Sequence, residues 1–152
     1  MTADEPLILY GVPFSQPVRA VMWLLLLKHL PFNMVLINPG SKGQSGSRNA
    51  SYLAKNPGGT IPCIEETDTG FVLAEAHAIM CYLSRKHGWT DVYPSNEQLR
   101  AQVDWYLHFH HRTIRNASIG MVAPKIRKDL DIPEVIQTSA RADLTSALKT
   151  LE

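Results

Sequence analysis

The sequence has only two cysteines, almost no net charge and no apolar run long enough to cross a membrane. Cys63 and Cys81 match no zinc or dithiol spacing. With 15 Lys and Arg against 14 Asp and Glu, the chain has no field that would attract nucleic acid or anionic lipid. The apolar stretch 20–27 is shorter than the roughly 20 residues that a bilayer requires. No secretory signal precedes it. These absences predict a cytoplasmic, reducing location with no membrane or nucleic-acid partner.

The first part of the chain has the pattern of alternating strands and helices. Apolar runs bounded by turn residues predict strands, and apolar residues at helical spacing predict helices. The predicted strands cover residues 7–10 and 31–38 and the stretches TIPCIEE and GFVLAEA, and the predicted helices cover residues 16–30, 52–55 and 76–86. The order is therefore βαβ followed by ββα.

The pattern changes near residue 89, and no strand signal follows about Val72. Ser95 with Gln98 three residues later forms a capping box, which predicts the start of a long helix. The apolar stripe of that helix comprises Leu99, Val103, Tyr106, Leu107 and Ile114. A further helix is predicted to begin at Pro133. The chain is thus an α/β unit followed by helices only.

Ser15 stands between Pro13 and Pro17, directly ahead of the first predicted helix. Proline is well tolerated in the first helical turn, and serine is common at the N-cap for structural reasons alone. This segment by itself favours a structural cap over a catalytic serine.

Four stretches in order resemble the theta class of cytosolic glutathione transferases: FSQPVRA, NPGGTIP, LAEAHAIMCYL and DVYPSNEQLRAQVDWYL. The resemblance implies an α/β thioredoxin-like domain over residues 1–88, a linker over 89–96 and a partial, all-α C-terminal domain over 97–152. It also implies a homodimer. Family members continue through several more helices beyond the point that corresponds to Glu152.

The resemblance further implies which residues bind glutathione. A cis bond between Ile61 and Pro62 would leave the Ile61 backbone free to pair with the cysteinyl part, as an added strand does. The helix that begins at Ala76 would present its N–H groups to the γ-glutamyl carboxylate, and Glu75 would face the ammonium group. Ala76 stands where the family has Ser, and Ser45 where theta-class members have His for the glycyl carboxylate. Thr60 likewise stands at a place often taken by Lys, and these three departures suggest weakened glutathione affinity and not a different ligand.

Ser15 matches the theta-class serine whose hydroxyl donates to the glutathione sulfur, so the resemblance favours a catalytic role over a cap. Arg115 matches an arginine that lines the electrophile site, and a surface arginine explains it equally well. Asp104, His108 and His111 share a helical face and could in principle bind a metal. There is no H-E-x-x-H motif, however, and a polar helix face is far more usual, so no metal is predicted.

The predicted function is that of a glutathione transferase in detoxification. A glutathione thiolate would attack small electrophiles or reduce organic hydroperoxides, with glutathione as cosubstrate and no metal or organic cofactor. The alternative is a non-catalytic, transferase-like module that binds ligands or proteins, which Ala76 and Ser45 favour slightly. A thiol–disulfide oxidoreductase is poorly supported, because no cysteine lies at the first helix.

Overall fold

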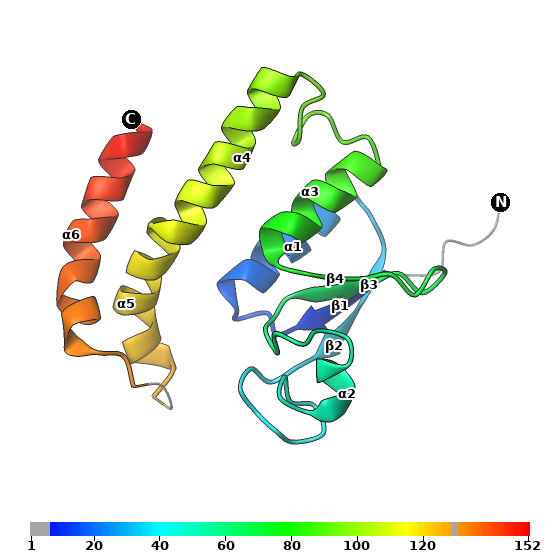
Figure 1. Ribbon diagram of the computed structural model, residues 1–152, viewed down its shortest axis with the longest axis horizontal. Helices are drawn as coiled ribbons and strands as arrows, with labels where there is room; N and C mark the ends of the chain where they lie inside the picture. Colours follow the sequence, from blue (N-terminus) through cyan, green and yellow to red (C-terminus); the bar gives the residue numbers. More distant parts are fainter. Residues whose placement is uncertain (1–6, 129–130) are drawn as a thin grey trace. The chain divides into compact units, whose positions relative to one another are not determined.

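The computed structural model describes residues 7–128 and 131–152. The chain divides into two compact units, one ending at Val92 and the other beginning at Tyr93 (Figure 1). The first unit contains β1 (Leu7–Gly11), α1 (Gln16–Leu27), β2 (Phe32–Leu36), α2 (Ala50–Leu53), β3 (Cys63–Glu65), β4 (Val72–Ala74) and α3 (Ala76–Lys86). The second unit contains α4 (Glu97–Arg112), α5 (Ile114–Ile126) and α6 (Glu134–Leu151).

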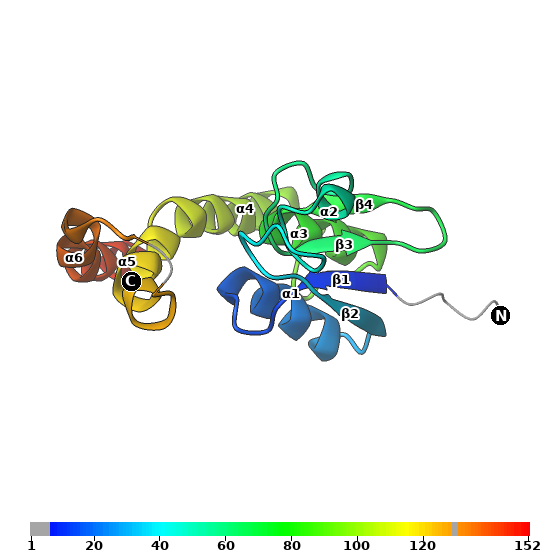
Figure 2. The same ribbon diagram turned by 90° about the horizontal axis from the view of Figure 1, so that it is seen from below.

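The strands of the first unit form one mixed sheet in the order β2-β1-β3-β4. β1 and β2 run parallel, whereas β3 runs antiparallel to both of its neighbours (Figure 2). A parallel pair needs a crossover connection, and α1 supplies it. The predicted βαβ-ββα order of a thioredoxin-like domain is therefore confirmed, and so is the all-helical second part.

The two faces of the sheet pack against different helices, because successive side chains of a strand point to opposite faces. Leu9 and Ile64 belong to a core cluster that also contains buried apolar residues of α1 and α3. Tyr10 and Cys63, their neighbours in sequence, belong to a second cluster with Tyr52 of α2. The ribbon shows the same division, with α1 and α3 on one side of the sheet and α2 on the other (Figure 1).

Helix α1 ends at Leu27, three residues before the predicted end. His29 adopts a positive φ of 51°, a conformation that His tolerates better than most residues. The His29 N–H donates to the Leu26 carbonyl at 3.2 Å, and the Leu30 N–H donates to the Leu25 carbonyl at 3.0 Å. These two bonds form a Schellman motif, which ends the helix without a glycine.

The predicted capping box at the start of α4 is wrong. The N-cap is Asn96, and its side chain accepts a hydrogen bond from the Leu99 N–H at 3.0 Å. Asparagine is at least as good a cap as serine, so the helix begins at Glu97 with a single cap in place of the reciprocal pair of Ser95 and Gln98.

The single long helix predicted to reach Ile114 is also wrong, because it divides at Thr113. The Thr113 hydroxyl donates to the Phe109 carbonyl at 2.5 Å, and the backbone there departs from helical values with φ −116° and ψ −72°. Threonine that bonds back to the preceding turn often bends a helix. Ile114 therefore begins α5, a separate helix that the sequence pattern did not reveal.

Helices α5 and α6 pack through small side chains. Ala117, Gly120, Ala140 and Ala147 are the buried residues of these two helices. A Cβ atom on Gly120 would lie only 2.7 Å from the Ala140 Cβ atom, so glycine permits the close approach. The predicted start of α6 at Pro133 is correct to within one residue.

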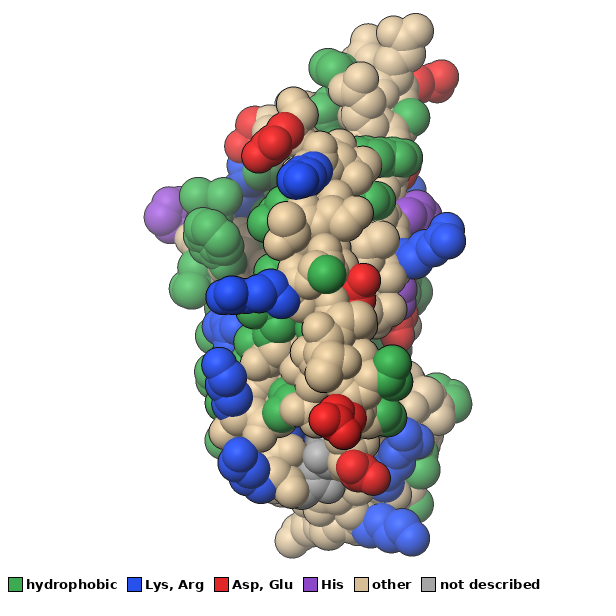
Figure 3. All heavy atoms as spheres, turned by 90° about the vertical axis from the view of Figure 1, so that its left-hand side faces the viewer, with side chains coloured by type: hydrophobic (Ala, Val, Ile, Leu, Met, Phe, Trp, Pro, Cys, Tyr) green, Lys and Arg blue, Asp and Glu red, His purple; other side chains and the backbone are tan. Residues whose placement is uncertain are grey.

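Large apolar side chains on α6 remain exposed, with Val135 at 71% and Leu148 at 49%. On the side of the molecule seen in Figure 3, hydrophobic side chains are scattered among polar and charged ones. Within residues 7–128 and 131–152, no helix is both long enough and apolar enough to cross a membrane.

Candidate active site

Four chain segments meet at one edge of the sheet, which is formed by the carboxyl ends of β1, β2 and β4 and the amino end of β3. Gly11 at the end of β1 pairs with Leu36 at the end of β2. Tyr10 pairs with Cys63, the first residue of β3, and Cys63 pairs in turn with Ala74, the last residue of β4. The loops that follow β1, β2 and β4 and the segment that precedes β3 therefore meet at this edge. Six of the seven predicted site residues lie on these segments: Ser15, Ser45, Ile61, Pro62, Glu75 and Ala76.

Ser15 is the N-cap residue of α1, with φ −71° and ψ 124°. Its N–H donates to the Val12 carbonyl at 3.0 Å, but within the described residues its side chain makes no capping hydrogen bond. Arg19 steadies the preceding loop by donating to the Phe14 carbonyl at 2.6 Å. The partly buried Ser15 hydroxyl is thus held at the positive end of a helix without being used as a cap.

The Ile61–Pro62 peptide bond is cis, as the resemblance implies. β3 begins only at Cys63, so Ile61 lies just outside the ladder that joins β3 to β1 and β4. Pro62 is fully buried and Ile61 partly buried. Ile61 therefore takes no part in the pairing of β3 with β1 and β4, although it lies only two residues before the first paired residue.

Glu75 joins β4 to α3 and has an unusual backbone conformation. Its φ is 72° and its ψ is 115°, which is costly for a residue with a side chain, by about 1–3 kcal/mol. Such strained residues cluster at functional sites. The Glu75 side chain is exposed, and Ala76 follows as the first, buried residue of α3. Nothing in the sequence pattern reveals this conformation.

Ser45 lies exposed in the loop that follows β2. Its carbonyl accepts a hydrogen bond from the Asn38 N–H at 2.7 Å, which holds the middle of the loop close to the end of the strand. Sequence reasoning missed Arg48 in the same loop. A Cβ atom on Gly59 would lie 2.8 Å from the Arg48 Nη1 atom, so this guanidinium lies across the NPGG turn that leads to Ile61. The only feature of the sequence that could have pointed to this position is the presence of an arginine in the loop.

Arg115 belongs to the second unit, in the first turn of α5, and is described apart from the sheet edge. It is half-buried, and burial lowers the pKa of its guanidinium. Burial also lowers the pKa of His110, and the charge of Arg115 adds to that effect. A cation in so enclosed a place is unusual on a helix surface.

On the polar face of α4, His108 and His111 are exposed and Asp104 is partly buried. The Asp104 carboxylate accepts a hydrogen bond from the Tyr93 hydroxyl at 2.8 Å. Among residues 7–128 and 131–152, no group of three His, Cys, Asp or Glu side chains lies close enough to hold a metal ion. Cys63 is fully buried, and burial raises the pKa of its thiol to about 11. This thiol is therefore unreactive at neutral pH.

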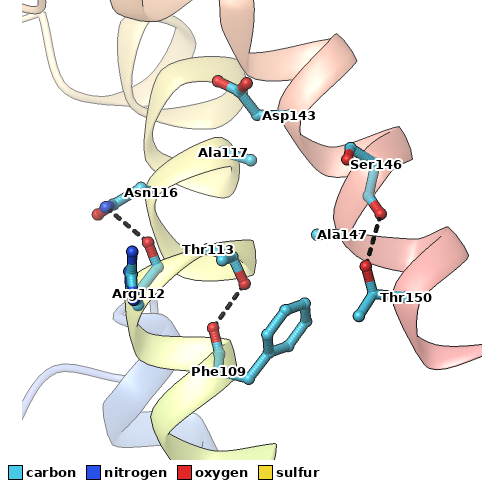
Figure 4. Close-up of a pocket in the computed structure, with 9 residues that line it drawn as sticks. All are labelled: Phe109, Arg112, Thr113, Asn116, Ala117, Asp143, Ser146, Ala147 and Thr150. Atoms are coloured by element: carbon cyan, nitrogen blue, oxygen red, sulfur yellow. Dashed lines mark hydrogen bonds between the residues drawn. The ribbon is translucent and has the colours of Figure 1, made fainter.

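The second unit also contains a groove of about 350 Å³ that sequence reasoning did not predict (Figure 4). α6 contributes Asp143, Ser146, Ala147 and Thr150, and the end of α4 and the start of α5 contribute the rest. The Thr150 hydroxyl donates to the Ser146 carbonyl of α6, whereas the Thr113 hydroxyl and the Asn116 amide donate to the Phe109 and Arg112 carbonyls in the last turn of α4. None of the predicted site residues lines this groove.

Comparison with known proteins agrees with the fold. Residues 9–94 match the family model of the glutathione S-transferase N-terminal domain. Glutathione S-transferase theta-3 of Mus musculus and theta-1 of Homo sapiens are each 34% identical over 149 residues. Both alignments cover 95% of this chain and 60% of the relative. The chain thus spans about 60% of the length of these two relatives.

Solved structures give the same assignment. A glutathione transferase of Bombyx mori, BmGSTD1, has a TM-score of 0.82 at 28% identity, covering 97% of this chain and 64% of its own. Human glutathione transferase theta-2, solved in complex with glutathione, has a TM-score of 0.78 at 31% identity, with coverages of 96% and 60%. With the family model matching more than half of its residues, the chain belongs to the glutathione S-transferase family and is related to its theta class.

Proposed function

We propose that the chain binds glutathione along the sheet edge and acts as a glutathione transferase. The observation that carries this proposal is the convergence of Ser15, the cis Ile61–Pro62 bond and the Glu75–Ala76 junction at one edge of the sheet. Each segment offers a different kind of contact: a hydroxyl donor at Ser15, a backbone edge at Ile61 and helix N–H groups at Ala76. These suit the thiol, the main chain and a carboxylate of a short acidic peptide.

The backbone of Ile61 pairs with the cysteinyl part of glutathione, because it takes no part in the pairing of β3 with β1 and β4. The first N–H groups of α3 receive the γ-glutamyl carboxylate, which the helix dipole favours. The Glu75 carboxylate faces the ammonium group beside it. Ser45 contributes to the glycyl end, and Arg48 supplies a cation there that a carboxylate prefers.

Ser15 donates its hydroxyl to the glutathione sulfur and so favours the thiolate over the thiol. A hydrogen bond to a charged group contributes roughly 1.5–3 kcal/mol. The thiolate then attacks a small electrophile or reduces an organic hydroperoxide, as in detoxification. No metal or organic cofactor takes part, and glutathione is the cosubstrate. Arg115 is proposed to face the electrophile.

The protein is further proposed to work in the cytoplasm as a homodimer. Exposed apolar side chains support an assembly, since large apolar groups on a surface often mark an interface. Trp23 and Leu26 on α1 are 74% and 60% exposed.

A non-catalytic binding module is the second candidate. Ala76 and Ser45 favour it, because both positions lack a side chain with which the family holds glutathione. In this second candidate the chain binds glutathione but catalyses no reaction, so binding and catalysis must be measured separately.

Two measurements test the proposal. We expect the chain to be retained on immobilised glutathione and to elute with free glutathione, but not with the oxidised disulfide form. Conjugation of glutathione to a chlorinated nitrobenzene would then be measured against the uncatalysed rate. Retention without turnover would establish the binding module, and no retention would refute both candidates.

A further inference from the structure

Two buried side chains donate to a single carbonyl oxygen next to the proposed site. The Tyr52 hydroxyl donates to the Thr60 carbonyl at 2.6 Å, and the Asn56 Nδ2 group donates to the same oxygen at 2.9 Å. Tyr52 is only 3% and Asn56 only 6% exposed. Burial raises the pKa of Tyr52 to about 12, so its hydroxyl keeps its proton at neutral pH.

Asn56 is itself held in one orientation. Its Oδ1 atom accepts a hydrogen bond from the Gly58 N–H at 3.1 Å, so its Nδ2 group must be the one that faces Thr60. The Asn56 backbone carbonyl accepts a further bond from the Gly59 N–H at 2.9 Å. The NPGG turn therefore fixes the position of the Asn56 Nδ2 donor.

Holding the Thr60 carbonyl also fixes the direction of the next N–H group. Among the described residues, Ile61–Pro62 is the cis peptide bond, so the Thr60–Ile61 bond is trans. In a planar trans peptide the C=O and N–H groups point in opposite directions. With the carbonyl directed towards Tyr52 and Asn56, the Ile61 N–H is directed away from them.

We propose that Tyr52 and Asn56 are positioning residues that hold the Thr60–Ile61 peptide plane ready to pair with the main chain of a bound thiol peptide. The inference rests on the proposed binding of glutathione at the same edge. A plane held before the ligand arrives avoids the entropy cost of ordering it on binding.

The experiment compares Tyr52→Phe with a matched control, Tyr10→Phe. The Tyr10 ring packs edge-on against Tyr52 at 6.0 Å in the same core cluster, but its hydroxyl donates to Glu65. Each variant therefore loses one buried hydroxyl, and only Tyr52→Phe affects Thr60. Asn56→Asp is the second variant, because it keeps the acceptor for Gly58 and removes the donor to Thr60.

Three quantities would be measured: the glutathione dissociation constant by calorimetry, the Ile61 amide order parameter without ligand, and the denaturant midpoint. We expect Tyr52→Phe and Asn56→Asp to weaken glutathione binding about three- to tenfold and to lower the Ile61 order parameter. Tyr10→Phe should lower the denaturant midpoint and leave the other two quantities unchanged.

The outcomes separate this inference from the proposed function. If the wild type binds glutathione and Tyr52→Phe binds it equally well, the inference is wrong and the proposed function stands. Equal weakening in Tyr52→Phe and Tyr10→Phe would show a general loss of stability and would also overturn the inference. A wild type that binds no glutathione overturns the proposed function itself, and with it the ligand assigned to Ile61.

Discussion

The hydroxyl of Tyr10 on β1 donates a 2.5 Å hydrogen bond to the Oε2 atom of Glu65 on β3. Lys55, two residues beyond the end of α2, contacts both oxygens of the same carboxylate, at 2.9 and 2.7 Å. One carboxylate thus links two strands to the segment that follows α2. The hydrogen bond from Lys55, and then that from Tyr10, lowers the pKa of Glu65.

Glu65→Gln should make the protein less stable at neutral pH and less sensitive to acid. Because the pKa of Glu65 is lower in the folded than in the unfolded chain, its stabilisation is complete above the unfolded value of about 4.3. It is lost as the pH falls through the folded value. We expect a loss of roughly 1.5–3 kcal/mol at pH 7 that shrinks below about pH 4, measured by denaturant unfolding.

Glu152→Gln is the control for this measurement, because Glu152 is exposed at the last position of the chain. Its stability should follow that of the wild type at every pH. A difference between Glu65→Gln and wild type that stays constant from pH 7 to pH 3 would show that the charge of Glu65 is not what links the strands.

Ser15→Ala should leave glutathione binding nearly intact and cut turnover by roughly ten- to a hundredfold. A free thiol has a pKa of roughly 8.5, and a donor to the thiolate lowers that pKa by roughly one to three when the positive helix end is included. The ultraviolet absorbance of bound thiolate would be followed against pH in both forms. Ser95→Ala, at an exposed serine, serves as control. Identical titrations for wild type and Ser15→Ala would show that the Ser15 hydroxyl does not stabilise the thiolate and that Ser15 only marks the start of α1.

Ala76→Ser should tighten glutathione binding by about tenfold, because it adds a hydroxyl donor for the γ-glutamyl carboxylate at the start of α3. Ala78→Ser is the matched control, since Ala78 is exposed on the same helix two residues later. Calorimetric titration of all three proteins gives the comparison. Equal affinity of Ala76→Ser and wild type would mean that the backbone N–H groups of α3 suffice.

Gly120→Ala should destabilise the packing of α5 on α6 by about 1–3 kcal/mol, since the added Cβ would meet both the Ala140 Cβ and the Ile136 carbonyl oxygen at 2.7 Å. Better helix propensity offsets about 1 kcal/mol of this loss. Ala140→Gly in the same chain removes one of the two obstacles. A double-mutant cycle on unfolding should therefore give a favourable coupling, and strict additivity would contradict the packing described.

Much of the first unit could be predicted, because its strands and helices differ clearly in apolar period. Helix α3 covers the predicted residues 76–86, and the four strands occur in the predicted order. The errors lie where two local signals compete. Ser95 and Asn96 are both good caps, and only the backbone geometry decides between them. Thr113 gives no sign in the sequence that its hydroxyl will bond back to Phe109.

The candidate site was predictable only as a set of residue types. The resemblance singled out Ser15, Ile61 and Glu75, but no local pattern specifies the positive φ of Glu75 or the capping bond that Ser15 lacks among the described residues. Arg48 was missed because its proximity to Gly59 depends on how a Gly- and Ser-rich loop folds back on the NPGG turn. Such contacts join residues distant in sequence, and periodicity carries no information about them.

The meeting of four separate chain segments at one edge of the sheet has a consequence for folding. No fragment that lacks β1, β3 or β4 can present the whole edge, so a ligand bound there recognises only the assembled sheet. Mass action then couples occupancy to folding: at a hundred times its dissociation constant, such a ligand adds about 2.7 kcal/mol to the free energy of unfolding. The concentration of free glutathione would in that way set how often the first unit opens, and with it the exposure of its chain to proteases.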